Sequence, residues 1–237
     1  MFVLYRQTYK WLTALLLATL FFTLLILQGC TEPKAKLLTH SGMTMGTSFT
    51  VKWFGDSSQT DSIKKDMTAS LVAINQSMST YIKDSELSLI NQLPANSSVP
   101  LSPELTEVLE LALDISEKSA GAFDITVGPL VNLWGFGPDG RILHAPTEES
   151  IEQIRKRVGF SYLALDKSAR TLSKSRESYI DLSAIAKGYA VDQLARLLES
   201  YGVSSYLVEI GGELRAKGVK PEGNHWRIAV ESPVNAA

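Results

Sequence analysis

The spacing of apolar residues predicts both helices and strands after residue 40. Apolar side chains recur every three or four residues from about Asp61 to Met78 and again after Pro103, so each segment should bury one face of a helix. The expected buried positions are Ile63, Met67, Leu71, Ile74 and Met78 in the first helix, and Leu105, Val108, Leu109, Ala112 and Ile115 in the second. Phe49, Val51 and Trp53 alternate with polar residues instead, which predicts a strand.

Capping residues locate further helix ends. Ser102 before Pro103 predicts an N-cap, and Thr147 followed by two glutamates predicts another. Asp84 is expected to cap a short helix, and a longer helix is expected from about Ala184 to Tyr201. The remaining predicted strands are Tyr162–Asp166, Tyr179–Leu182, Ser205–Ile210 and Trp226–Val230. Together these elements predict an α+β fold in a single compact domain over residues 41–237.

The first thirty residues form a separate segment. Arg6 and Lys10 precede a nearly continuous apolar run from Trp11 to Leu27, and Cys30 follows Leu27-Gln28-Gly29. This resembles a bacterial lipoprotein signal with its lipobox, which implies a signal peptide over 1–29, a lipidated Cys30 and a polar tether over 30–40. An uncleaved transmembrane anchor is the alternative, because 17 apolar residues can just span a bilayer. Both interpretations place the rest of the chain outside the cytoplasm.

Composition excludes several classes of protein. The 237 residues carry a formal net charge of -2, which argues against a nucleic-acid partner. A single Cys excludes a disulfide framework within the chain and a four-thiolate zinc site. The three histidines are widely separated and form no short metal-binding motif.

The segment from Asp181 to Asp192 is the strongest candidate for ligand chemistry. It runs from a predicted strand into a predicted helix, where Ser183 can cap the helix and free backbone N–H groups favour an anion. Lys187 lies within about one turn of that helix start, so a bound phosphate would contact both the lysine and the backbone donors. The alternative is an ordinary capped helix with a solvated lysine.

Other segments are compatible with a flat ligand. Small residues beside Phe123 and Asp124 would let an aromatic ring approach the backbone, although a core loop is the better explanation. Thr44-Met45-Gly46-Thr47 is typical of a tight turn, and Tyr81 follows in a loop. Gly211-Gly212 permits either close approach of a ligand or a hairpin turn. The sequence contains no nucleophile elbow, phosphate-binding loop or dinucleotide-binding glycine motif.

Taken in order, these stretches resemble the FAD:protein FMN transferase family, called ApbE. The resemblance covers about Ser41 to Pro233 and implies a domain of the ApbE, T-fold-like type. It rests on Met45-Gly46-Thr47, Met78-Ser79-Thr80-Tyr81, Asp84-Ser85-Glu86, Gly121-Ala122-Phe123-Asp124, Val127-Gly128-Pro129-Leu130-Val131, Leu133-Trp134-Gly135-Phe136-Gly137, Asp181 to Asp192 and Ile210-Gly211-Gly212-Glu213.

The resemblance implies a function and a site. Family members bind FAD and Mg²⁺, release AMP and attach FMN to a threonine of an acceptor protein, such as a subunit of a membrane redox pump or a periplasmic FMN-binding domain. The residues that would contact FAD are Met45, Tyr81, Ala122, Phe123, Asp124, Asp181 and Lys187. The carbonyl of Ala184 would bind the metal, and no catalytic residue is assigned. The enzyme would be lipid-anchored on the periplasmic side of the inner or outer membrane.

One departure from the family pattern concerns the C-terminus. The family continues beyond the point where this sequence stops, and that part supplies an Asp/Thr metal-binding motif and a Ser-His segment. We therefore expect a C-terminally incomplete transferase domain over 41–237. A flavin-binding lipoprotein without transferase activity and an FAD pyrophosphatase remain as alternatives.

Overall fold

The computed structural model describes residues 19, 35–138 and 140–230. Apart from Thr19, the expected signal peptide, Cys30 and residues 31–34 of the tether lie outside the described residues, as do residues 231–237. Within the described part, no helix combines the length and apolar character needed to cross a membrane. Residues 36–138 and 140–230 form one compact unit that contains both helices and strands, which confirms the predicted α+β domain.

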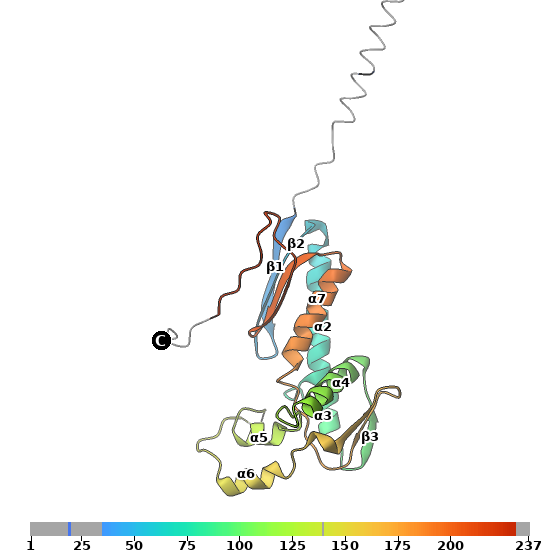
Figure 1. Ribbon diagram of the computed structural model, residues 1–237, viewed down its shortest axis with the longest axis vertical. Helices are drawn as coiled ribbons and strands as arrows, with labels where there is room; N and C mark the ends of the chain where they lie inside the picture. Colours follow the sequence, from blue (N-terminus) through green and yellow to red (C-terminus); the bar gives the residue numbers. More distant parts are fainter. Residues whose placement is uncertain (1–18, 20–34, 139, 231–237) are drawn as a thin grey trace, which may run out of the picture. The chain divides into compact units, whose positions relative to one another are not determined.

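The elements follow one another as β1 (Lys36–Thr44), β2 (Thr47–Gly55), the 3-10 helix η1 (Ser57–Gln59), α2 (Thr60–Met78), α3 (Glu86–Asn91), β3 (Ser97–Pro100), α4 (Pro103–Lys118), α5 (Gly128–Leu133), α6 (Glu148–Arg155), the 3-10 helix η2 (Phe160–Tyr162), β4 (Leu163–Asp166), β5 (Thr171–Lys174), α7 (Ala186–Ser200), β6 (Ser205–Ile210) and β7 (Glu213–Lys217) (Figure 1).

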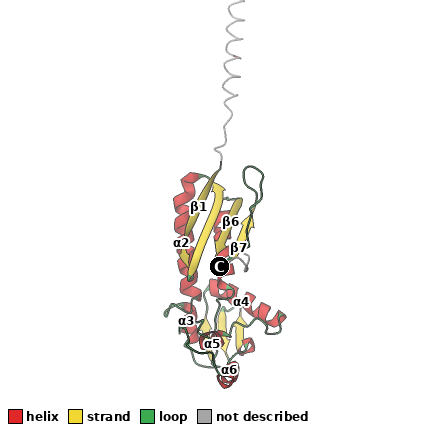
Figure 2. Cartoon of the chain, turned by 90° about the vertical axis from the view of Figure 1, so that its left-hand side faces the viewer, coloured by secondary structure: helices red, strands yellow, loops and turns green. Residues whose placement is uncertain are grey.

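Four antiparallel strands form the larger sheet, in the order β1-β2-β6-β7 (Figure 2). Helices α2 and α7 pack against each other and cover one face of this sheet (Figure 1). Strand β1 was not predicted: residues 36–40 were expected in the tether, and they instead pair with the second half of β2. Its sequence lacks a clear alternation of apolar and polar residues, so the strand becomes evident only from its hairpin with β2.

The core lies between this sheet and its helices. Phe49, Val51 and Trp53 are buried on β2, and all five apolar positions predicted for α2 are buried. Trp53 lies directly opposite Tyr206 on β6, and both side chains are fully buried. In α4, four of the five predicted positions are buried, whereas Ile115 is only partly buried because Ser116 occupies the inward position at the end of the stripe.

A second, smaller sheet contains β3, β5 and β4 in that order (Figure 2). Strand β4 confirms the predicted strand, but β3 and β5 were not predicted, because each has four residues and little apolar character. Lys174 on β5 is almost fully buried and donates hydrogen bonds to the carbonyls of Ile90 (3.0 Å) and Ser178 (3.3 Å). Burial lowers the pKa of this lysine.

The predicted caps are largely confirmed. Ser102 accepts a hydrogen bond from the N–H of Leu105 at 3.2 Å, and Thr147 accepts one from Ser150 at 3.3 Å. The cap of α3 is Ser85 rather than the expected Asp84.

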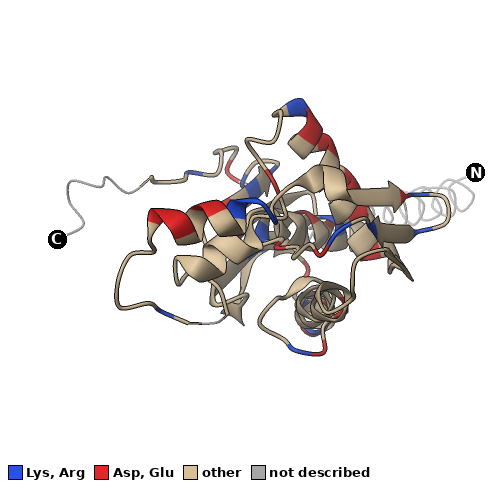
Figure 3. Ribbon diagram, turned by 90° about the horizontal axis from the view of Figure 1, so that it is seen from below, with Lys and Arg blue, Asp and Glu red and all other residues tan. Residues whose placement is uncertain are grey.

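Charged residues of both signs lie along the helices in Figure 3.

Two predicted strands do not form. Tyr179–Leu182 forms no strand: the side-chain amide of Asn91 bonds both the N–H and the carbonyl of Ile180 at 2.8 Å, where a neighbouring strand would otherwise bond. Trp226–Val230 has no strand partner within the described residues, although the indole N–H of Trp226 donates to the Lys217 carbonyl at 3.2 Å. The prediction of strands at these two segments was therefore wrong.

Two glycines give a matched test of packing. A Cβ on Gly128 would lie 2.4 Å from Tyr179 Cδ1, whereas a Cβ on Gly188 in α7 would have no atom within 4 Å. We expect Gly128→Ala to lower the free energy of unfolding by about 1–3 kcal/mol through overpacking. Gly188→Ala should raise it by up to about 1 kcal/mol, because alanine is the better helix former. Urea unfolding of both variants measures these changes. Equal changes in the free energy of unfolding would contradict the close packing of Gly128 against Tyr179.

Candidate functional site

A cavity of about 580 Å³ brings together three stretches that are far apart in the sequence. Met45 and Gly46 come from the β1–β2 turn, residues 78–82 lie at and just beyond the end of α2, and Ser183 and Lys187 lie just before and within the first turn of α7. Three of the expected FAD contacts, Met45, Tyr81 and Lys187, therefore line one cavity. We call this cavity the Lys187 pocket.

The turn that carries Met45 is fixed to helix α2. Met45 and Gly46 have positive φ angles of 50° and 73°, as the predicted tight turn requires. The side-chain amide of Asn75 donates to Thr44 Oγ1 at 3.0 Å and to the Leu71 carbonyl at 2.8 Å. Met45 is thereby held at the edge of the pocket by a side chain from α2.

Tyr81 presents its ring to solvent at the pocket. Its side chain is 63% exposed, and its hydroxyl donates to the backbone carbonyl of Phe136 at 3.1 Å. Phe136 is 76% exposed and lies just beyond α5, so this bond ties the loop after α5 to the pocket. An exposed aromatic face at a cavity suits the stacking of a flat ring.

The approach to α7 differs from its prediction. Ser183 does not cap the helix, because residues 183–185 form a turn and the N-cap position belongs to Ile185. The carboxylate of Asp181 accepts a hydrogen bond from the Ser183 N–H at 2.8 Å and is largely buried. Lys187 is the second residue of the helix, close to its positive end as predicted.

Lys187 is paired with Glu213, the first residue of β7. Lys187 Nζ lies 2.9 Å from Glu213 Oε2, and the two side chains are 30% and 41% exposed. The Gly211-Gly212 segment forms the hairpin turn between β6 and β7, with φ angles of 57° and 97°. A Cβ on Gly211 would lie 2.7 Å from Thr47 Cγ2 and 3.3 Å from Lys187 Cδ. The hairpin turn expected at these glycines is present, and close approach of a ligand there stays a prediction.

The Gly121–Asp124 segment does not line the Lys187 pocket. Asp124 Oδ1 accepts hydrogen bonds from the N–H and the hydroxyl of Thr126, both at 2.7 Å, and Oδ2 accepts from the Phe160 N–H at 2.9 Å. Ala122 is exposed, and Phe123 is partly buried against the core. Both carboxylate oxygens of Asp124 therefore bind this chain's own donors, and the residue organises its loop.

Asp181 connects this loop to the start of α7. Its N–H donates to the Ile125 carbonyl at 2.8 Å, one residue beyond Asp124. Of the seven expected FAD contacts, Met45, Tyr81 and Lys187 line the Lys187 pocket, whereas Ala122, Phe123, Asp124 and Asp181 do not. The two groups meet at the short segment from Asp181 to Ser183.

A second cavity, of about 990 Å³, lies among α4, α7 and β7. Ala184 and Glu213 both line it, as do acidic residues of α4 such as Glu107. The described residues contain no cluster of three or more His, Cys, Asp or Glu side chains suited to a metal. The Lys187–Glu213 pair thus joins the two cavities, since Lys187 lines the first and Glu213 the second.

Two tyrosines that lie near opposite ends of α7 have altered acidity. Burial, and then the nearby charge of Glu107, raises the pKa of Tyr189 to about 12. Burial and a hydrogen bond to Glu199 at 2.6 Å raise the pKa of Tyr206 to about 12. Both hydroxyls are therefore expected to stay protonated in the folded protein well above the pH at which a free tyrosine ionises.

This shift predicts a loss of stability in alkali. Because the folded pKa lies above the unfolded value near 10, the stabilisation is complete below pH ~10 and falls as the pH rises from about 10 to 12. In Tyr206→Phe, the free energy of unfolding should fall less steeply with pH. Urea unfolding at pH 9, 10 and 11 measures this dependence. The same pH dependence in wild type and variant would contradict the expectation.

Sequence reasoning missed the residues that hold the site together. Asn75, Glu213 and the Phe136 carbonyl each contact a predicted site residue or its turn, although none lies within ten residues of its partner. Glu213 had one indication, since it follows the Gly211-Gly212 pair that brings β7 back to the start of α7.

Comparisons with known proteins identify the family. The ApbE family model matches residues 45–237. A protein of Haemophilus influenzae named FAD:protein FMN transferase is 44% identical over 216 residues, covering 88% of this chain and 62% of its own length. The corresponding protein of Vibrio cholerae is 42% identical over 227 residues, covering 94% of this chain and 65% of its own length.

Solved structures of flavin transferases support the same family assignment. The flavin transferase ApbE from Vibrio cholerae superimposes with a TM-score of 0.79 at 42% identity, over 84% of this chain and 65% of that one. The apo form of the Pseudomonas stutzeri flavinyl transferase ApbE gives a TM-score of 0.78 at 39% identity, over 84% of this chain and 66% of that one. The chain spans a little under two thirds of the first two relatives' length, and it belongs to the ApbE family.

Proposed function

We propose that this chain binds FAD in the Lys187 pocket and forms part of an enzyme that transfers FMN from FAD to a threonine of an acceptor protein. The observation that carries the proposal is the meeting of Met45, Tyr81 and Lys187 in one cavity. It is supported by 44% identity to a protein named FAD:protein FMN transferase. Because the chain spans 62% of that relative, the activity is proposed for the whole protein.

In the proposed reaction, the threonine oxygen forms a bond to the phosphorus of the FMN half while the bond from that phosphorus to the bridging oxygen breaks. AMP leaves with the bridging oxygen, and the hydroxyl proton is released. Phosphoryl transfer of this kind depends mainly on positioning and charge neutralisation. Lys187 and the positive end of α7 would neutralise the diphosphate, and Tyr81 would hold the ring system.

A magnesium ion fits the residues around Ala184. Magnesium typically uses few protein ligands and completes its shell with substrate phosphates and water, so it does not require a cluster of side chains. Ala184 is exposed in the turn before α7, close in sequence to Ser183 and Lys187 of the pocket. We propose that its carbonyl binds Mg²⁺. The ion would add positive charge at the diphosphate.

Titration of the chain with FAD, followed by quenching of flavin fluorescence, tests binding. Incubation with FAD, Mg²⁺ and an acceptor domain tests transfer, and we expect a fluorescent acceptor band in a denaturing gel. Free FMN without a labelled acceptor would indicate a pyrophosphatase instead. Binding that is insensitive to Mg²⁺ and gives no product would indicate a flavin-binding protein, and absence of binding would contradict the proposal.

We also propose that the chain is anchored by lipid on Cys30 at the periplasmic side of the inner or outer membrane. The support is the apolar run followed by Leu27-Gln28-Gly29-Cys30. Acceptors would then be membrane redox-pump subunits or periplasmic FMN-binding domains. Cys30→Ser should prevent incorporation of labelled fatty acid, and continued labelling would contradict the anchor.

A further inference from the structure

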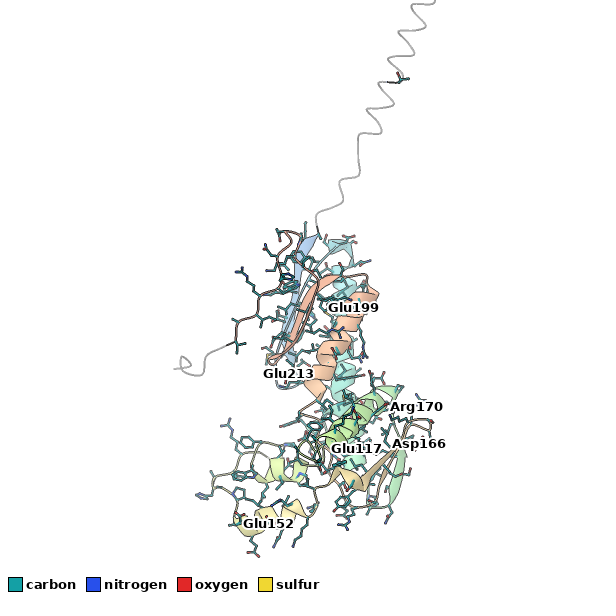
Figure 4. The ribbon with its side chains drawn as sticks, viewed as in Figure 1. Glu117, Glu152, Asp166, Arg170, Glu199 and Glu213 are labelled. Atoms are coloured by element: carbon teal, nitrogen blue, oxygen red, sulfur yellow. The ribbon has the colours of Figure 1, made fainter. Side chains whose placement is uncertain are left out.

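The Lys187–Glu213 pair places a carboxylate beside the cation that would bind the diphosphate. Lys187 Nζ lies 2.9 Å from Glu213 Oε2. That oxygen is buried, and within the described residues no hydrogen-bond donor satisfies it. The ion pair with Lys187 is therefore its compensating interaction. Figure 4 labels Glu213 at the lower end of the four-stranded sheet, where β7 begins.

A phosphate that reaches Lys187 meets a cation whose charge is already balanced. The ligand must share the ammonium group with Glu213, and it is repelled by the carboxylate itself. The pair is only partly screened by water, because the lysine and glutamate side chains are 30% and 41% exposed. A ligand with one phosphate gains little binding free energy from such a site. A diphosphate gains more, because it can also accept hydrogen bonds from the backbone N–H groups at the start of α7.

We propose that Glu213 is a specificity-determining residue, which competes with the ligand for Lys187 and so weakens the binding of single phosphates relative to a flavin diphosphate. This inference rests on the proposed function, since it takes the Lys187 pocket as the phosphate site. The β6–β7 hairpin keeps the Glu213 carboxylate close to Lys187. Gly211 has a φ of 57° and lets this hairpin pass close to Thr47 and Lys187. Glu213 follows two residues later at the start of β7.

The test compares wild type and Glu213→Gln with riboflavin, FMN and FAD, which carry no, one and two phosphates. We expect the variant to bind FMN about fivefold more tightly, FAD by a smaller factor, and riboflavin within twofold of wild type. Glu222→Gln is the matched control, because Glu222 is exposed and its replacement causes the same change in net charge. Unchanged or weaker binding of FMN to Glu213→Gln would overturn the proposal.

Inorganic pyrophosphate and phosphate separate this inference from the proposed function. If wild type fails to bind FAD, the proposed function fails. A stronger gain for phosphate than for pyrophosphate in Glu213→Gln would still support the role of Glu213, and equal or smaller gains would overturn it. Thermal unfolding establishes that the variant is folded. If it is not, Glu213→Thr provides a second neutral side chain with a high preference for strands, and the same outcomes apply.

Discussion

Replacement of Asp124 by alanine is expected to lower the free energy of unfolding by about 3 kcal/mol. Its two carboxylate oxygens accept three hydrogen bonds, from the N–H and hydroxyl of Thr126 and from the N–H of Phe160. Alanine would remove all three and leave buried donors without partners, since Thr126 is fully buried. Urea unfolding monitored by circular dichroism measures the loss.

Asp124→Asn is the matched control for charge. Its remaining oxygen can accept from Thr126, whereas its amide group faces the Phe160 N–H, so we expect an intermediate loss of stability. If Asp124 serves only to contact ligand, both variants will unfold like wild type. In that case the loss would appear only in flavin binding, and the organising role assigned to its hydrogen bonds would be wrong.

Lys187→Met is expected to weaken FAD binding by about 10- to 100-fold while leaving riboflavin binding nearly unchanged. The estimate corresponds to losing one or two hydrogen bonds between an ammonium group and phosphate oxygens. Methionine retains much of the apolar stem that passes Gly211, but it leaves Glu213 without its ion-pair partner. Thermal unfolding of the variant therefore accompanies the binding measurement. Fluorescence titration with the two flavins measures the difference.

The control for this substitution is Lys65→Met on the exposed side of α2. It removes the same charge at a position that does not line the pocket, and its FAD affinity should match wild type. Equal weakening by both substitutions would indicate a general electrostatic effect. An equal loss of FAD and riboflavin in Lys187→Met would indicate damage to the pocket rather than loss of a phosphate contact.

The helices could be predicted because their signals are local. The five apolar positions of α2 and the Ser102 and Thr147 caps all depend on residues within a few turns, and all are confirmed. Pairing of short strands depends on distant partners instead. The sequence around Tyr179–Leu182 therefore indicated a strand, but not that Asn91, 89 residues away, would occupy its hydrogen bonds.

The candidate site also combines features that could be predicted from the sequence with features that could not. The resemblance to the ApbE family implied that Met45, Tyr81 and Lys187 contact one ligand, and the fold places them around one cavity. Their supports could not be predicted, because the Asn75–Thr44 and Lys187–Glu213 contacts form only when α2, α7 and the hairpins pack. Ser183 was predicted as a cap from local preference, yet Asp181 already binds its N–H.

Strand β1 begins at Lys36, and this start limits how far the folded domain can lie from a lipid attached to Cys30. Lys36 is the sixth residue after Cys30, and a fully extended chain of that length spans at most about 20 Å. If acyl chains on Cys30 enter the bilayer, the folded domain must begin within this distance of the lipid surface. The Lys187 pocket lies at the other end of β1, beside Met45, which is about 27 Å of strand further along. Acceptors whose modified threonine stands clear of the lipid headgroups would therefore remain within reach.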